Sequence, residues 1–259
     1  MSGLSDEGRT NLAKLMHIEP AGRAIPSTPY YSGLLHFVIP LISIITRLRI
    51  FGSENIPSKG PVIVAANHLS HLDPALAIYS SRRKLFYLAK DEHFKKIGWR
   101  QLMLATGQVE TNRSFGGDDA IARAADVLNA GMPLGIFPEG TRFRNTSPPF
   151  LSRGKTGIAR IAAAFPDVPV IFCGINGSRE ILAPGEPFLP RFWKRTDLRF
   201  SSTITWNEWA GHEKGGGITD SEVDKMARLT KEKMHEKKRE LYRKFTNQTI
   251  ATIAALGAP

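Results

Sequence analysis

The chain has 259 residues, of which 42% are hydrophobic, so it is long enough to bury one substantial core of the α/β type. Its formal net charge of +11 favours acidic partners: nucleic acid, an anionic membrane or a phosphorylated substrate. The single cysteine, Cys173, excludes an internal disulfide and is typical of a reducing compartment.

The N-terminal region divides into a polar part and an apolar part. Residues 1–30 are polar and proline-containing, which predicts a loosely structured arm with room for one short helix over 5–17 and no secretory signal peptide. Residues 34–48 are apolar, and Pro40 is expected to kink a helix there. This stretch is shorter than the roughly twenty residues that a membrane span needs. It is therefore a core helix that covers the sheet or an interfacial helix lying in one leaflet, and the two are not exclusive.

The stretch on which the rest of the chain depends is 62–74, which reads Val-Ile-Val-Ala-Ala-Asn-His-Leu-Ser-His-Leu-Asp-Pro. Its apolar, partly β-branched start predicts a strand buried on both faces. Asp73 and Pro74 predict the N-cap and the first residue of a helix. The polar loop between these elements lies where open α/β sheets bind ligands, so we expect the catalytic centre there.

His68 and Asp73 are the expected general base and its orienting acid. In a continuous helix, residues five apart point roughly 140° away from each other, whereas a tight loop brings them together. An imidazole held by a carboxylate is fixed in one tautomer and is more basic. Asp73 can cap the helix and hold His68 at once, because a carboxylate has two oxygens. A metal bound by His68, His71 and Asp73 is the alternative, but no second cluster of His, Cys and acids accompanies them.

The remaining chain alternates predicted strands and helices. Strands are expected over 85–89, 107–113, 133–137, 168–175 and 200–206, and helices over 90–104, 118–129 and 153–165. Residues 211–217 predict a flexible glycine-rich hinge, and 221–245 predict one long helix. The basic faces of that helix are either solvated or in contact with anionic lipid.

The expected fold is α/β: a single domain with a largely parallel or mixed central sheet flanked by helices. We expect two further segments outside this domain: an N-terminal apolar membrane-associated helix segment and a long basic C-terminal helix. The expected division is an N-terminal arm and apolar interfacial helix over 1–49, a catalytic α/β domain over 50–210, and a hinge and C-terminal helix over 211–259.

A second polar motif follows the strand predicted over 133–137. It reads Phe-Pro-Glu-Gly-Thr-Arg over residues 137–142. Backbone N–H groups around Gly140, the hydroxyl of Thr141 and the guanidinium of Arg142 are suited to holding an anion such as a phosphate.

The two motifs, Asn67-His-Leu-Ser-His-Leu-Asp73 and Phe137-Pro-Glu-Gly-Thr-Arg142, lie about seventy residues apart. Together they resemble the glycerolipid acyltransferases, and among them the lysophosphatidate (1-acylglycerol-3-phosphate) acyltransferases. The resemblance covers about residues 50–177. Two intermediate motifs depart from the family pattern, because residues 110–112 before Arg113 read Glu-Thr-Asn and because Phe172 stands where the family commonly has a proline.

The resemblance implies transfer of a fatty acyl group to the free hydroxyl of 1-acylglycerol 3-phosphate, giving phosphatidic acid. The donor is a thioester of coenzyme A or acyl carrier protein, used as a co-substrate, and no metal or other cofactor is implied. His68 would remove the hydroxyl proton and Asp73 would orient His68. Arg113 and Arg142 would hold the acceptor phosphate, and Lys155 is added to them on its position at the start of a helix.

The remaining site residues are expected to shape the pocket: Ser70, Glu139, Gly140 and Thr141. The family scheme has direct attack without an acyl-enzyme, and Ser70 and Thr141 are the nearest candidates for a nucleophile against it. Glycerol 3-phosphate or another lysophospholipid is the alternative acceptor. A lipid-surface binding protein without activity is the alternative from another class.

We expect the protein to be associated with an anionic membrane surface on the cytoplasmic face, as a monotopic rather than a spanning protein. Arg47 and Arg49 are expected among lipid headgroups. No nucleic-acid partner is expected, because the cations are scattered and aromatic residues do not interleave with them.

Overall fold

The computed structural model describes residues 4–28, 31–90, 100, 103, 107–111, 117–142, 147–182, 191 and 193–259. Within these residues, seven strands form one sheet in the order β1-β7-β6-β2-β5-β3-β4. The strands are β1 (Leu48–Phe51), β2 (Ile63–Ala66), β3 (Phe86–Lys90), β4 (Gln108–Thr111), β5 (Leu134–Ile136), β6 (Val170–Asn176) and β7 (Thr196–Phe200). The helix predicted over 90–104 falls almost entirely outside the described residues.

The sheet is mixed, as expected. Strands β2 to β6 run parallel to their neighbours, whereas β7 is antiparallel to β6 and parallel to the edge strand β1. The chain turns into β1 directly after the apolar helical segment, so the expected boundary at residue 49 falls inside a strand. β1 pairs with a strand that lies about 150 residues later, and short-range pattern does not reveal such a partner.

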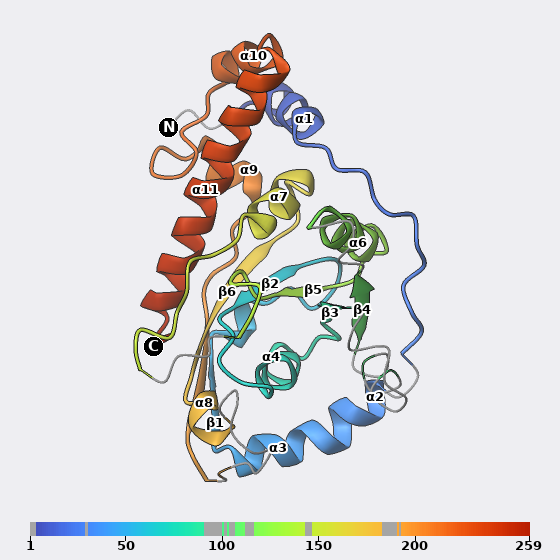
Figure 1. The fold of residues 1–259 in the computed structure, drawn as a ribbon, viewed down its shortest axis with the longest axis vertical. Coiled ribbons are helices and arrows are strands. Elements are labelled where there is room, and N and C mark those ends of the chain that lie inside the picture. The colour runs from blue at the N-terminus through green and yellow to red at the C-terminus, as the bar shows by residue number, and fades with distance from the viewer. Residues whose placement is uncertain are drawn as a thin grey trace.

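Helices cover both faces of the sheet (Figure 1), with α4 and α3 on one side and α6, α7 and α11 on the other. The helical elements are α1 (Asp6–Leu15), α2 (Tyr31–Gly33), the π-helix η1 (Leu34–Val38), α3 (Ile39–Ile45), the 3₁₀-helix η2 (Ser53–Asn55), α4 (Asp73–Ser81), α6 (Asp118–Asn129), α7 (Gly157–Ala164), α8 (Ser178–Ile181), α9 (Trp206–Gly211), α10 (Asp220–Ala227) and α11 (Lys231–Ala255).

The central strand β2 contributes to two cores. Ile63 and Ala65 are buried with α6, α7 and α11, while Val64 and Ala66 are buried with α4. Successive side chains of a strand point to opposite faces, so a strand covered on both sides must be apolar throughout. This is why an unbroken apolar run leads into the polar loop at residue 67.

The short helix expected over 5–17 is confirmed as α1, but this segment is packed on the domain, so the prediction of a loose arm is wrong there. Leu12 and Met16 are buried in the same core as α11. The backbone N–H of Ser5 donates to Asp220 Oδ1 (3.1 Å), which joins α1 to α10. Leu12 and Met16 lie four residues apart and so are on the same side of the helix. Because most residues around them are polar, this apolar side is not apparent from the composition of the segment.

The apolar segment forms a helical stretch over 31–45 at one end of the molecule (Figure 1). Its π-helical turn, η1, lies directly before Pro40, whose missing N–H breaks the regular helix pattern. Phe37, Leu41 and Ile44 expose 78%, 59% and 68% of their surface, whereas Ile42 packs on the core beneath. The segment therefore has one packed and one exposed apolar face. Among the described residues, no helix has the length and apolar character to cross a bilayer.

Two further predictions near the C-terminus are wrong. The strand expected over 200–206 ends at Phe200, and beyond it only Ile204 forms an isolated bridge, to Val170. Thr205 and Glu208 form a capping box that starts α9 instead. The expected glycine-rich hinge is an ordered turn, in which Gly216 N–H donates to Trp209 O (2.7 Å). Its glycines are required by the close approach of two backbones rather than by flexibility.

The long helix predicted over 221–245 is two helices, and the second is longer than expected. The chain leaves α10 at Ala227, and the Thr230 side chain accepts from Lys233 N–H to start α11. α11 then continues to Ala255 and buries Phe245 and Ile253 in the core. The prediction missed the break because Thr230, the N-cap of α11, lies inside a charged stretch that otherwise favours a continuous helix.

Candidate active site

Asn67 ends β2 and ties it to the neighbouring strand. Its Oδ1 accepts from Ile175 N–H (2.7 Å) and its Nδ2 donates to Ile175 O (2.9 Å), both fully buried. An amide that pairs with both groups of one peptide residue fixes the strand end where the loop begins. Local sequence pattern does not reveal this role, because Ile175 lies 108 residues away.

Asp73 organises the loop that follows. Its side chain is fully buried, and Oδ2 accepts from the backbone N–H groups of Leu69 and Ser70 (2.6 Å each) and faces His68 Nδ1 at 3.0 Å. The helix α4 begins at Asp73 itself, with Leu72 as its N-cap and no side-chain capping bond. The predicted N-cap role is therefore wrong, because the carboxylate is turned back to the donors of the loop.

His68 is held in one orientation from two directions. A carboxylate only accepts, so Nδ1 carries the proton and donates to Asp73, which leaves Nε2 with its lone pair. The ring is stacked on Phe137, with centroids 3.9 Å apart and planes 10° from parallel. Phe137 stacks in turn on Tyr87 at 5.1 Å, and Gly135 leaves room for the Tyr87 ring. The side chain of His68 keeps 17% of its surface exposed, so solvent or a substrate can reach it.

Glu139, in the turn after β5, fixes the same loop. It is 2% exposed, and Oε1 accepts from His68 N–H (2.9 Å), while Oε2 accepts from Ser152 Oγ (3.0 Å) and Ser152 N–H (3.3 Å). Burial raises the pKa of Glu139, although the bonds from His68 and Ser152 oppose that rise. Glu139 thus shapes the site by joining two loops, and Ser152 is a member of this network that sequence reasoning missed.

Gly140 and Lys155 form the turn after Glu139. Gly140 has a φ of +71°, and its N–H donates to Phe137 O (2.9 Å), so the expectation that this N–H is available to an anion is wrong. The Lys155 side chain lies over Gly140, and its backbone N–H donates to Pro138 O (2.7 Å). The lysine lies beside the motif and is exposed, but α7 begins only at Gly157, so the expectation that Lys155 lies in the first turn of a helix is wrong.

Arg142 lies against the imidazole of His71, which joins the second motif to the first. This contact brings a guanidinium to the loop that holds His68. Thr141 is exposed beside it. Arg113 lies outside the described residues.

Two buried side chains near the sheet, Ser70 and Cys173, carry groups that act as nucleophiles in other enzymes. Ser70 is fully buried, donates from Oγ to Leu182 O (2.8 Å) and accepts from Leu72 N–H (3.2 Å), so it stabilises the loop. Cys173 is fully buried on β6, and burial raises the pKa of its thiol far above the ordinary range. Neither has the exposed, activated character of a nucleophile.

Replacing Glu139 with glutamine tests the buried carboxylate. Because its pKa is raised in the folded state, its contribution to stability is present below the ordinary value of 4.5 and is lost as the pH rises through the native pKa. Glu139→Gln does not titrate, so the stability of the variant relative to the wild type should increase over that rise in pH. Urea unfolding across a pH series measures the difference, and a difference independent of pH would contradict the assignment.

The comparisons with known proteins agree on one family. Residues 47–176, half of the chain, match the family model described as Acyltransferase. A 1-acyl-sn-glycerol-3-phosphate acyltransferase of Borreliella burgdorferi is 32% identical over 115 residues, which cover 44% of this chain and 46% of that protein. Its namesake in Bacillus subtilis is 26% identical over 147 residues, 56% of this chain and 72% of that protein.

The fold agrees as well. The crystal structure of the 1-acyl-sn-glycerophosphate (LPA) acyltransferase PlsC from Thermotoga maritima matches with a TM-score of 0.51 at 21% identity, over 77% of this chain and 83% of that one. A third relative, from Chlamydomonas reinhardtii, is 30% identical, and the match covers 54% of this chain and 44% of that protein. The chain thus spans about half the length of two of these curated relatives. From the matched family model and the shared fold, the chain belongs to the acyltransferase family.

Proposed function

We propose that the protein transfers a fatty acyl group from a soluble thioester to the free hydroxyl of 1-acylglycerol 3-phosphate, giving phosphatidic acid. The observation that carries the proposal is the 3.0 Å contact between His68 Nδ1 and the buried Asp73 carboxylate, beside a loop that holds Arg142. The names of three relatives from different organisms support the choice of acceptor.

The chemistry assigned to His68 is that of a general base. The acceptor hydroxyl gives its proton to Nε2 as its oxygen attacks the thioester carbonyl carbon. A new ester C–O bond forms, the C–S bond breaks, and the departing thiolate takes the proton from the imidazolium. The negative charge of Asp73 stabilises that imidazolium while its backbone hydrogen bonds keep the carboxylate in place. No bond between the acyl group and the protein is formed.

The acceptor phosphate is assigned to cations near this loop. Arg142 offers a planar fork that suits a phosphate, and Lys155 adds a point charge beside Gly140. Arg113 belongs to the same proposal on the family resemblance alone. Glycerol 3-phosphate and other lysophospholipids also combine a phosphate with a free hydroxyl, so they are the alternative acceptors. Coenzyme A and acyl carrier protein are the donors to be compared, and no metal or other cofactor takes part.

Replacing His68 tests the assignment. We expect His68→Ala to lower acyl transfer to lysophosphatidate by about 10² to 10⁴, the usual contribution of a general base, with unchanged circular dichroism. His212→Ala, which removes an exposed histidine after α9, is the matched control and should keep wild-type activity. A panel of acceptors against both donor types identifies the preferred pair. Substantial activity in His68→Ala with any pair would refute the role.

As part of this proposal, the protein works on the cytoplasmic face of an anionic membrane without spanning it. Support comes from Phe37, Leu41 and Ile44, which expose a continuous apolar face on the helical stretch 31–45. Arg47 and Arg49 follow within five residues and can contact lipid phosphates, although Arg49 also pairs with Asp197 on β7 (2.7 Å).

Replacing Phe37, Leu41 and Ile44 together with serine tests the membrane contact. The triple variant should lose sedimentation with vesicles that contain phosphatidic acid, because buried apolar area drives interfacial binding. His36→Ala changes an exposed polar residue of the same stretch and should bind like the wild type. Equal sedimentation of the triple variant and the wild type would show that the protein binds the vesicles through another surface.

A further inference from the structure

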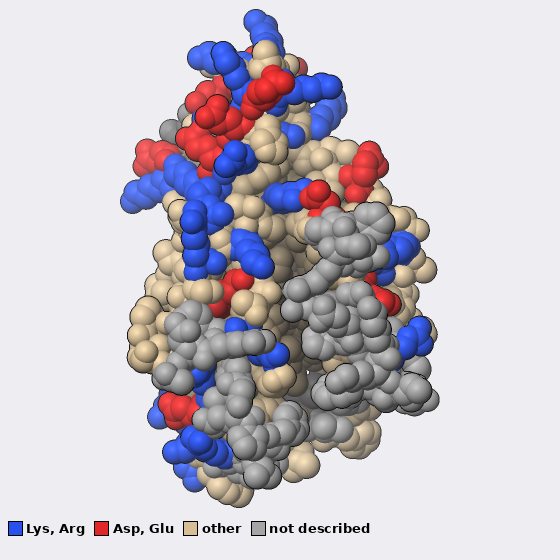
Figure 2. All heavy atoms as spheres, viewed as in Figure 1, with Lys and Arg blue, Asp and Glu red and all other residues tan. Residues whose placement is uncertain are grey.

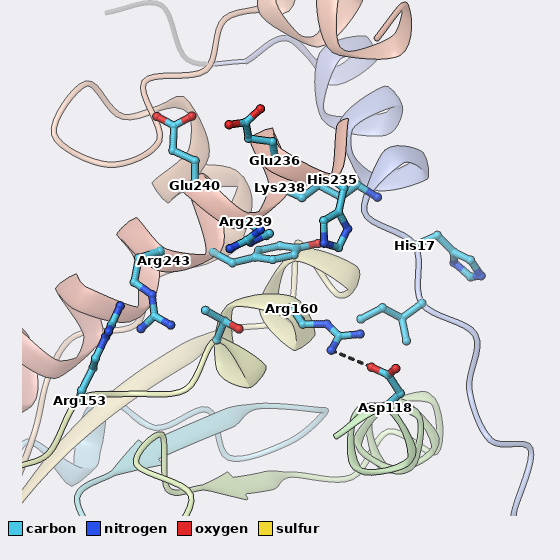
Figure 3. Close-up of a pocket in the computed structure, with 13 residues that line it drawn as sticks. His17, Asp118, Arg153, Arg160, His235, Glu236, Lys238, Arg239, Glu240 and Arg243 are labelled. Atoms are coloured by element: carbon cyan, nitrogen blue, oxygen red, sulfur yellow. Dashed lines mark ion pairs between the residues drawn. The ribbon is translucent and has the colours of Figure 1, made fainter. Parts of the chain in front are cut away.

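A groove of about 850 Å³ lies between α11, the start of α7 and the N-terminal segment (Figure 3). We call it the α11 groove. Its charged lining residues comprise five cations and three carboxylates, and two histidines accompany them. The cations are Arg153, Arg160, Lys238, Arg239 and Arg243. They come from three separate elements and converge on one hollow, which distinguishes them from cations spread over a solvated helix face.

The carboxylates of the groove leave much of this charge uncompensated. Asp118 pairs with Arg160 at 2.9 Å. Glu240 pairs with Lys237, which lies outside the groove (3.3 Å). In Figure 3, the carboxylates of Glu236 and Glu240 point away from Arg153 and Arg160. Among the residues that the structure describes, Arg153 and Arg239 have no acidic partner.

Two of the arginines are close neighbours. Arg243 Nη1 donates to Gly154 O (2.7 Å), which holds this guanidinium beside the residue that follows Arg153. Burial, and then the nearby charge of Arg153, lower the pKa of the Arg243 guanidinium. Like charges held together in this way are relieved by a bound anion, and phosphates are the anions that arginine forks fit best.

The groove shares a loop with the candidate active site. In the segment 152–156, Ser152 binds Glu139 and Lys155 covers Gly140, whereas Arg153 and Thr156 line the groove. A ligand in the groove is therefore next to the loop that supports His68. The acceptor phosphate is already assigned to Arg142 on the other motif, so these cations are left for the second substrate.

The location of the groove favours a water-soluble ligand over a lipid. The exposed apolar stretch 31–45 lies at one end of the molecule, and α10 with the first turns of α11 lies at the opposite end (Figure 1). Figure 2 shows charged side chains of both signs gathered around this second end, with many lysines and arginines among them. A membrane bound to the apolar stretch would therefore leave the groove facing water.

We propose that the α11 groove binds the phosphates of coenzyme A, the leaving group of the acyl donor. The inference rests on the proposed acyltransferase function and adds a site for the donor. Its several phosphates complement converging arginines, and its long, flexible pantetheine arm can follow the loop 152–156 towards His68. The groove volume lies within the roughly 300–1,000 Å³ that small-molecule sites occupy.

Calorimetric titration of the full chain with coenzyme A, and separately with inorganic pyrophosphate, tests the site. Arg153→Ala/Arg239→Ala should weaken coenzyme A binding about 10- to 100-fold, since two charged hydrogen-bond donors are lost. Arg153→Lys/Arg239→Lys keeps the positive charges but removes the planar guanidinium groups. Its affinity for coenzyme A should lie between those of the alanine variant and the wild type. Lys244→Ala removes an exposed cation of α11 outside the groove and should bind like the wild type. Thermal unfolding checks that all variants are folded.

The outcomes separate this inference from the proposed function. His68→Ala should bind coenzyme A like the wild type while losing acyl transfer. Equal coenzyme A binding by the wild type and Arg153→Ala/Arg239→Ala would overturn the groove assignment even if the protein is an acyltransferase. A loss confined to acyl carrier protein as donor, or to vesicle binding, would also overturn it and would identify the groove as a surface for that partner. Intact coenzyme A binding without acyl transfer by the wild type would overturn the function instead.

Discussion

The buried carboxylate of Asp73 is the group on which the site depends. A carboxylate taken fully out of water is costly unless hydrogen bonds replace its hydration, and here the loop supplies two backbone N–H groups and one imidazole N–H. Satisfying this one oxygen draws the loop 68–73 into a tight turn. It also decides which nitrogen of His68 faces outward. The hydrogen bonds that fold the loop therefore also orient the imidazole that we propose as the base.

Around this turn, other groups restrict movement without touching the exposed nitrogen. Asn67 fixes the loop to β6, Glu139 holds the His68 backbone, and Phe137 lies against its ring. These groups follow β2 and β5, two parallel neighbours whose carboxyl ends lie together, which is where parallel strands gather polar groups from distant parts of the chain. The N-terminal apolar stretch lies at the opposite end of the molecule from α10 and the first turns of α11, so the proposed membrane contact and the proposed coenzyme A site are on different surfaces.

The parts of this arrangement that follow from local pattern were predictable. The apolar run of β2 had to be buried on both faces, and the spacing of His68 and Asp73 excluded a continuous helix. Long-range partners were not predictable in the same way. Ser152 shows no motif that ties it to Glu139, and β1 reveals no partner until β7 is known. The predicted N-cap role of Asp73 was wrong because its carboxylate can accept either from the first N–H groups of α4 or from those of the loop before it. The sequence does not distinguish these two sets of donors, and in the folded loop the carboxylate accepts from Leu69 and Ser70.

A double-mutant cycle of acyl-transfer rates measures whether Asp73 acts through His68. The variants are His68→Ala, Asp73→Asn and the combination, compared under single-turnover conditions with lysophosphatidate and the preferred thioester. If the carboxylate serves only to orient and stabilise the imidazole, the combined variant should be no slower than His68→Ala alone, because residues that act as one unit give non-additive losses. Losses that multiply would contradict the account and show that Asp73 contributes independently of His68.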